Sequence, residues 1–189
     1  MRNRLFVCLT LLLTGLGAAA RGQDLPDRPP PIEIPDARRQ DGLNGSDRAQ
    51  IRKHLQYAAA LLEAAPEDET PEARTQRLTR AREHIVKRVY GWYPEHTYRY
   101  DVAAQAAQTL APLLQAPGAQ RQLVVAQALA QMPKVPIQPA LEGMVRSENP
   151  AVRYWGWKGY ADLVMPVLGQ ARLARQTLGA TVAQRAQSE

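Results

Sequence analysis

The chain has 189 residues, of which 24 are Lys or Arg and 18 are Asp or Glu, and its formal net charge is +6. This mild basic excess fits ordinary solubility, and it would also suit an anionic surface such as a cell-wall polymer, a lipid headgroup or an acidic protein. The only cysteine, Cys8, lies in a segment that we expect to be removed. Disulfides, thiolate nucleophiles and cysteine-ligated metals are therefore excluded from the mature protein.

Residues 1–20 have the layout of a secretory signal peptide. Arg2 and Arg4 precede an apolar run at 5–16, and small alanines at 18–20 offer a cleavage site. The run is shorter than the about 20 apolar residues that span a bilayer, which favours a cleaved signal over a retained N-terminal anchor. We therefore expect a periplasmic or secreted protein with no membrane span after signal cleavage.

Residues 21–46 have the composition of a linker. They contain five prolines, three glycines and many charges. Such a segment buries too little apolar area to offset the entropy lost on ordering. Three consecutive prolines at 29–31 favour the extended polyproline II conformation. We expect a Pro-rich disordered linker that holds the body away from a membrane or complex.

From Ser46, a potential helix cap, apolar residues recur with the helical period, so 47–189 is predicted to be one all-helical domain. No stretch has the alternation of a strand, and alanine, leucine, glutamine and arginine favour helices. The expected helices are approximately 46–65, 71–89, 101–115, 119–132, 137–146, 150–164 and 167–184. Short connections that contain Pro or Gly favour antiparallel neighbours.

Residues 113–132 align with 144–163 at an offset of 31 residues, which suggests a repeated helical hairpin. The segment 141–163 has an apolar first helix, a Glu-Asn-Pro turn at 148–150 and a second helix that opens with Val-Arg at 152–153. This segment resembles a HEAT or armadillo repeat. The resemblance implies a short right-handed α-solenoid of helical hairpins, and the alternative is an irregular helical bundle.

Within that resemblance, single residues have expected roles. Asn149 would cap the second helix and Val152 would enter the core. The resemblance implies that Arg153 reaches polar groups of a neighbouring repeat. Gly156 and Gly159 would permit close approach of two helices. An apolar face over 167–182 would mark an open end of the array that needs a capping partner.

No catalytic signature is present. His54, His84 and His96 lack the spacing of zinc ligands, and His54 is expected to be solvated. No serine lies in a GxSxG context, and no Gly-rich loop could hold a phosphate. We therefore expect no catalytic residues, no metal site and no cofactor, and the protein is not expected to be an enzyme.

Two aromatic clusters, at 92–101 and 154–160, are the candidate binding sites, because exposed rings beside polar groups suit protein contacts or sugar stacking. The alternative is that these rings form a rigid connector and part of the core. The candidate residues are Trp92, Tyr93, His96, Tyr98, Arg99, Tyr154 and Trp157.

These observations favour an exported protein-binding or scaffold module whose partner is another protein. The arginine-rich stretch at 74–88 suggests nucleic acid, but export and the acidic residues upstream favour a solvated face with local ion pairs. The alternative is a glycan-acting or glycan-binding protein of the cell wall, with Glu95, Asp101 or His96 as acid and base.

Overall fold

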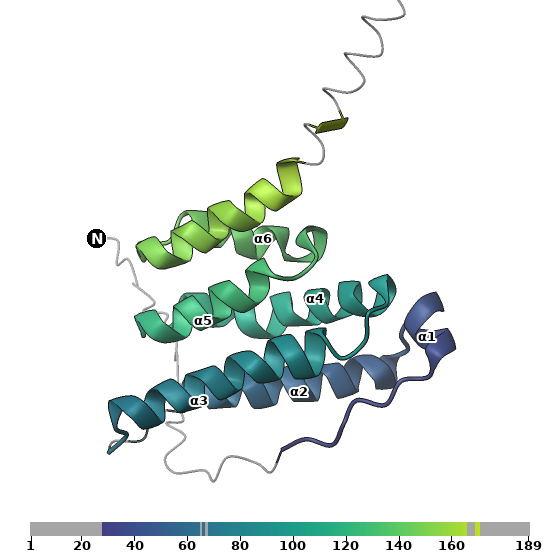
Figure 1. Cartoon of the computed structure of the whole chain (residues 1–189), viewed down its shortest axis with the longest axis horizontal. Helices are drawn as coiled ribbons and strands as arrows, with labels where there is room; N and C mark the ends of the chain where they lie inside the picture. The colour runs from purple at the N-terminus through teal and green to yellow at the C-terminus, as the bar shows by residue number, and fades with distance from the viewer. Residues whose placement is uncertain (1–27, 65, 67, 166–168, 171–189) are drawn as a thin grey trace, which may run out of the picture.

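The computed structural model describes residues 28–64, 66, 68–165 and 169–170. The signal peptide at 1–20, the helix expected over 167–184 and its apolar face lie, wholly or largely, outside these residues. Within them the chain is helical and contains no strand, which confirms the all-α class (Figure 1). The elements are α1 (Asp36–Asp41), α2 (Gly45–Glu63), α3 (Pro71–Glu83), π-helix η1 (His84–Tyr90), α4 (His96–Leu110), 3₁₀-helix η2 (Ala111–Leu114), α5 (Ala119–Ala130), α6 (Lys134–Val145) and a last helix at 150–165.

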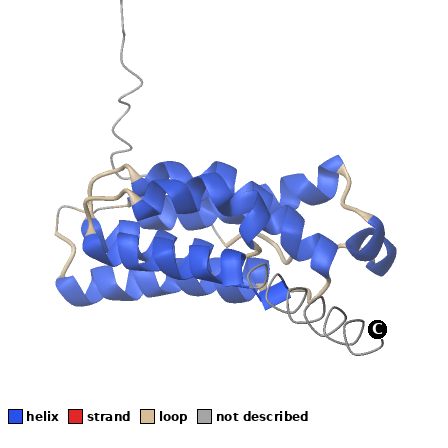
Figure 2. Cartoon of the chain, turned by 90° about the horizontal axis from the view of Figure 1, so that it is seen from above, coloured by secondary structure: helices blue, strands red, loops and turns tan. Residues whose placement is uncertain are grey.

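The long helices form two layers. In one layer α2 contacts α4 and α4 contacts α6, while in the other α3 contacts α5 and the helix at 150–165 follows. Seen from above, the layers lie side by side (Figure 2). Consecutive helices therefore pair across the layers, as α2 with α3, α4 with α5, and α6 with the last helix, and their facing apolar residues make one core.

The helix starts follow local hydrogen bonding. The α2 cap is Asn44 rather than the expected Ser46: the Asn44 side chain accepts a hydrogen bond from the Asp47 amide at 2.9 Å, and the Asp47 carboxylate accepts one from the Asn44 amide at 3.1 Å. This reciprocal pair satisfies two amides that a helix start leaves unbonded. Thr70 caps α3, with Pro71 at its first position.

The helix expected over 71–89 changes its winding at His84, where η1 begins. It ends with a hydrogen bond from the Gly91 amide to the Val86 carbonyl at 2.8 Å, five residues back. A Cβ on Gly91 would lie 2.8 Å from that same oxygen, so the close turn requires glycine. The next helix starts at His96 rather than 101, and tightens to a 3₁₀ turn over 111–114.

The expectation of a disordered linker is wrong for residues 28–46. Ile32, Ile34 and Leu43 are buried in the core, and α1 lies between them. The Tyr93 hydroxyl donates a hydrogen bond to the Ile32 carbonyl at 2.9 Å. The alternating isoleucines bury apolar area against the helices. This burial offsets the entropy that the segment loses on ordering, which its prolines and charged residues do not offset.

The hairpin of α6 and the last helix has the close helix approach expected at Gly156 and Gly159. A Cβ on Gly156 would lie 2.7 Å from the Val145 nitrogen, and one on Gly159 would lie 2.5 Å from the Leu141 Cδ2. The Asn149 side chain accepts a hydrogen bond from the Ala151 amide at 3.1 Å, and Val152 is fully buried. These three expectations are confirmed.

The expected role of Arg153 is wrong. Its guanidinium donates to the carbonyls of Ser147 and Glu148, at 2.8 and 2.9 Å, so it bonds its own turn. The contact with the preceding hairpin comes instead from the Asn149 side chain, whose Nδ2 donates to the Gln122 Oε1 at 3.2 Å. Arg153 thereby satisfies two carbonyls of the turn that joins α6 to the last helix.

We predict opposite effects of alanine at two helical glycines. Gly156→Ala should lower the free energy of unfolding by about 1–3 kcal/mol, because the added methyl group meets backbone atoms. Gly143→Ala is the matched control, since nothing lies within 4 Å of its Cβ position, and it should stabilise by about 0.5–1 kcal/mol through helix propensity. Urea unfolding measures both, and equal effects would contradict the tight contact.

Candidate functional site

Tyr98, expected to bind a partner, is part of the core. Its side chain is fully buried and its hydroxyl donates to the Val89 carbonyl at 2.7 Å. Burial raises the pKa of the Tyr98 phenol above its ordinary value. The prediction that Tyr98 contacts a partner is therefore wrong, since the α4 face that holds it packs against η1.

Tyr93 holds the N-terminal segment, and the Trp92 ring packs edge-on against the Tyr93 ring. Both rings are half-buried against the core. The Tyr93 hydroxyl, which donates to Ile32, also accepts from the Ile34 amide at 3.4 Å, and the Arg39 guanidinium carbon lies 4.0 Å above the Tyr93 ring. The fold uses these side chains to fix residues 28–39.

Arg99 and His96 do not join the other connector residues at one site. The Arg99 Nε donates to the Tyr93 carbonyl at 3.3 Å, and its guanidinium lies 5.2 Å from the Tyr90 ring centre. His96 is exposed and stacks on Tyr100, with ring centres 6.4 Å apart. The connector is thus a set of packing contacts rather than one binding surface.

The two carboxylates of the glycan hypothesis are engaged in ion pairs. Glu95 lies 3.2 Å from an Arg39 nitrogen, and Asp101 lies 3.1 Å from the Arg48 Nε. Each arginine comes from the N-terminal part of the described chain. The pairs join α1 and α2 to α4, so both acids have structural partners.

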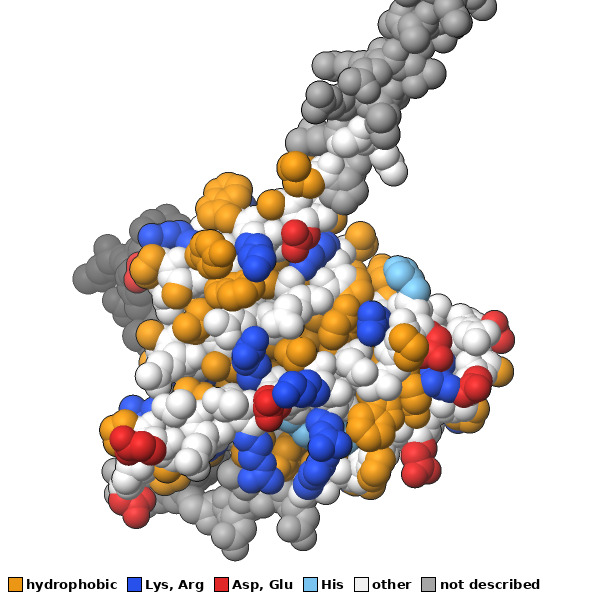
Figure 3. Space-filling view, viewed as in Figure 1, with side chains coloured by type: hydrophobic (Ala, Val, Ile, Leu, Met, Phe, Trp, Pro, Cys, Tyr) orange, Lys and Arg blue, Asp and Glu red, His pale blue; other side chains and the backbone are white. Residues whose placement is uncertain are grey.

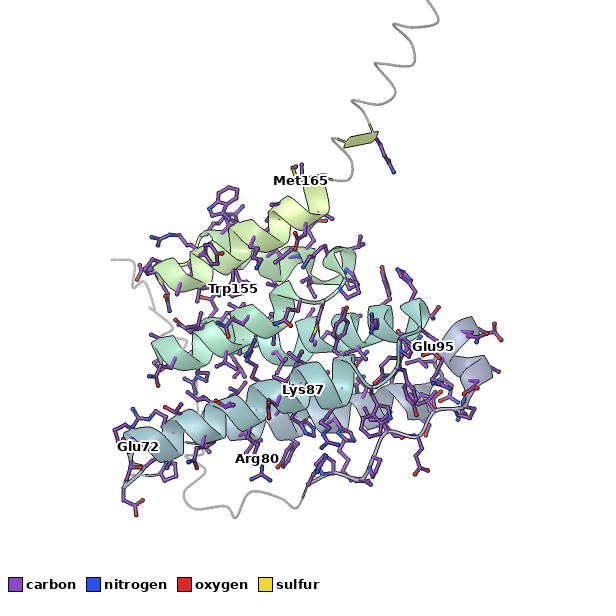
Figure 4. All side chains as sticks on the ribbon, viewed as in Figure 1. Glu72, Arg80, Lys87, Glu95, Trp155 and Met165 are labelled. Carbon is purple, nitrogen blue, oxygen red and sulfur yellow. The ribbon has the colours of Figure 1, made fainter. Side chains whose placement is uncertain are left out.

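The second cluster forms an exposed apolar stripe on the outer face of the last helix. Tyr154 and Trp157 are each 61% exposed, Met165 is 64% exposed and Val164 is 41% exposed. Their spacing places them along one side of a helix. Orange apolar atoms lie over this helix at the upper edge of the molecule (Figure 3), and Figure 4 shows Met165 at its end. We call these four residues the outer stripe.

Trp155 marks the opposite face of the same helix. It is half-buried against the core, and the Lys158 ammonium lies 4.6 Å from its ring centre. Residues such as Tyr154 and Trp157 therefore point away from the face that Val152 and Trp155 bury. Of the candidate binding residues, this exposed pair is the one that the structure places on a common surface.

A buried histidine pair was missed by sequence reasoning. The His54 Nδ1 lies 3.1 Å from the His84 Nε2, the rings stack with centres 5.2 Å apart, and the His54 Nε2 lies 2.7 Å from the Pro30 carbonyl. The expectation that His54 is solvated is wrong. The sequence feature that could have predicted the burial of His54 is its position three residues after the buried Ile51, on the same helical stripe.

The proton positions follow from the Pro30 carbonyl, which can only accept. The His54 Nε2 must donate to it, so in neutral His54 the Nδ1 accepts and the His84 Nε2 donates to that atom. Burial lowers the pKa of His54, and burial together with His54 and nearby arginines lowers the pKa of His84 to about 4. Both rings are uncharged near neutral pH.

Two absences hold for the part of the chain that the structure describes. No group of three or more His, Cys, Asp or Glu side chains there could hold a metal ion. No helix there is long and apolar enough to cross a membrane.

Comparisons with known proteins give no relative. No family model matches the chain, no curated protein matches it, and no solved structure matches it.

The histidine pair predicts a loss of stability on acidification. The unfolded chain takes up protons at the ordinary histidine pKa of about 6.5, whereas folded His84 resists protonation until about 4. Stability is therefore fully present above that ordinary value and should fall by roughly 2 kcal/mol between about pH 7 and about pH 5. Urea unfolding at each pH measures it.

The matched variants for that series are His84→Gln and His96→Gln. The first should flatten the pH dependence because it removes the buried ring, whereas the second changes an exposed ring outside the pair. If both variants kept the full slope, the buried pair would not be its source.

We predict that Tyr93→Phe loosens the N-terminal segment. Loss of the hydroxyl leaves the Ile32 carbonyl without that donor and should destabilise by about 1 kcal/mol. Hydrogen exchange of amides at 32–34 should speed up, while the exposed Tyr100→Phe should change nothing there. Unaltered exchange in the Tyr93 variant would show that apolar packing alone holds the segment.

Proposed function

We propose that the protein is a protein-binding module that uses the outer stripe as its contact surface. The observation that carries this proposal is the exposure of Tyr154, Trp157, Val164 and Met165 along one side of the last helix. Large apolar patches on a soluble surface are typical of interaction sites, and Trp and Tyr dominate binding energies at such sites.

The paired helices support a short right-handed α-solenoid as the scaffold for this surface. Three consecutive antiparallel pairs pack with α2, α4 and α6 in one layer. The last pair carries the Asn149 cap and buried Val152 that its resemblance to a HEAT repeat implies. Stacked pairs of this kind present extended surfaces, and a pair that lacks a polar outer face leaves apolar side chains for a partner to cover.

The occupant that fits best is an amphipathic helix of another protein. The inner face of the last helix packs against α6, and its outer stripe has the spacing with which helices pack on helices. Lys158 and Asp162 are exposed on the same helix and would supply a polar rim of both signs. A partner helix would thus continue the stack.

The place of this contact follows from the expected export signal. A positive start, a short apolar run and small residues before position 21 support a location in the periplasm or outside the cell. The partner would then be a protein of the envelope or of the extracellular space.

The test is affinity capture from envelope extract with the full-length chain and two matched double variants. Tyr154→Ser with Trp157→Ser removes the rings of the outer stripe. Tyr100→Ser with Val135→Ser removes two exposed apolar side chains from α4 and α6. We expect one partner that the native chain and the second variant retain, and that the first variant loses by about tenfold or more in affinity.

Circular dichroism and urea unfolding check that both variants are folded. Exposed side chains contribute little to the core, so their loss should leave the fold intact. Equal capture by both variants, or no specific capture by the native chain, would contradict the proposal.

A further inference from the structure

A basic cleft lies away from the outer stripe, between the N-terminal segment, α2 and the α3–η1 helix. It consists of two neighbouring cavities of about 280 and 420 Å³ that share Arg28, His84 and Arg88. Arg80 and Lys87 also line the first cavity, and Ile32 and Trp92 are among the residues that line the second. Figure 3 shows Lys and Arg side chains gathered over this part of the surface, and Figure 4 labels Arg80 and Lys87.

The positive charges of the first cavity are largely uncompensated. Its one carboxylate, Glu83, is already bonded to Lys87 at 2.6 Å. Among the ion pairs that the described residues form, none involves Arg28, Arg80 or Arg88. Within the described part of the chain, three guanidinium groups thus border one small space without an ion pair of their own.

The floor of the cleft shows that these charges act at one place. His84 is buried there, and the pKa of its ring is lowered first by burial, then by His54, and further by Arg28, Arg88 and Arg80. Their positive fields therefore overlap at His84. Since His84 stays neutral, it adds no further repulsion and keeps the floor polar.

The backbone that follows Arg28 is anchored at two residues. The Pro30 carbonyl accepts the 2.7 Å hydrogen bond from His54, and the neighbouring Ile32 is buried. These two anchors hold the segment across α2, so Arg28 faces Arg80 and Arg88 over the cleft. The cleft exists because residues 28–32 are docked.

We propose that the basic cleft binds a phosphate group, presented by a soluble phosphate ester or by a lipid headgroup. Guanidinium groups recognise phosphate oxygens through paired hydrogen bonds, and the near-double charge of a phosphate monoester suits several of them together. The phosphate lies in the first cavity. The organic part of the ligand lies in the second cavity, against the Ile32 and Trp92 side chains.

The first experiment is calorimetric titration of the full-length chain with phenyl phosphate at fixed ionic strength. We expect saturable binding of one ligand per chain, and weaker binding of benzoate, which has the ring but only one negative charge. Arg80→Gln and Arg88→Gln should each weaken binding of phenyl phosphate by about tenfold.

Arg82→Gln is the matched control. Arg82 lies on the same helix, is exposed and changes the net charge equally, but it does not line the cleft. The affinity of the Arg82→Gln variant for phenyl phosphate should stay within about twofold of the native value, because distant surface charges are screened by salt. All three arginines are exposed, so the variants should fold, which urea unfolding verifies.

Vesicles distinguish the two sources of phosphate. If the native chain binds phenyl phosphate and also co-sediments with phosphatidylcholine vesicles that contain phosphatidic acid, and Arg88→Gln impairs both, the ligand is a lipid headgroup. Binding of phenyl phosphate alone assigns a soluble ester. Failure to bind either probe, or equal weakening by Arg82→Gln and Arg88→Gln, would overturn the proposal.

Discussion

The hydrogen bond between the Pro30 carbonyl and the His54 Nε2 is the constraint on which the docked N-terminal segment, the tautomers of the buried histidine pair and the basic cleft depend. It fixes the proton on His54, and through the 3.1 Å contact it fixes the proton on His84. It also ties a Pro-rich segment to α2, and Tyr93 holds the same segment through its hydrogen bond to the Ile32 carbonyl. A stretch with the composition of a spacer thereby becomes part of the core and one wall of the basic cleft.

The two proposed surfaces differ in chemistry and in position. The outer stripe is apolar and belongs to the last described helix, whereas the basic cleft is cationic and lies between the N-terminal segment and α3 with η1. A chain with both could hold a protein at one end of the stack and a phosphate group at the other.

The sequence predicts the helices well because their apolar residues repeat with the helical period, and Gly156, Asn149 and Val152 act as expected. It fails where partners are distant in the chain. His54 and His84 are thirty residues apart, and the carbonyl they depend on lies in a segment without helical pattern. Tyr98 looked like a surface ring because its neighbours are polar, but α4 begins earlier than expected and turns it inward.

The central functional claim is that the outer stripe binds another protein. The most direct test is site-specific photo-crosslinking in the producing cell, with a photoreactive amino acid at position 157 or, for comparison, at the exposed position 100. We predict one discrete adduct with another polypeptide from position 157 and none from position 100. A crosslink from position 157 only within the same chain, or the same adducts from both positions, would show that the outer stripe is not a protein-binding surface.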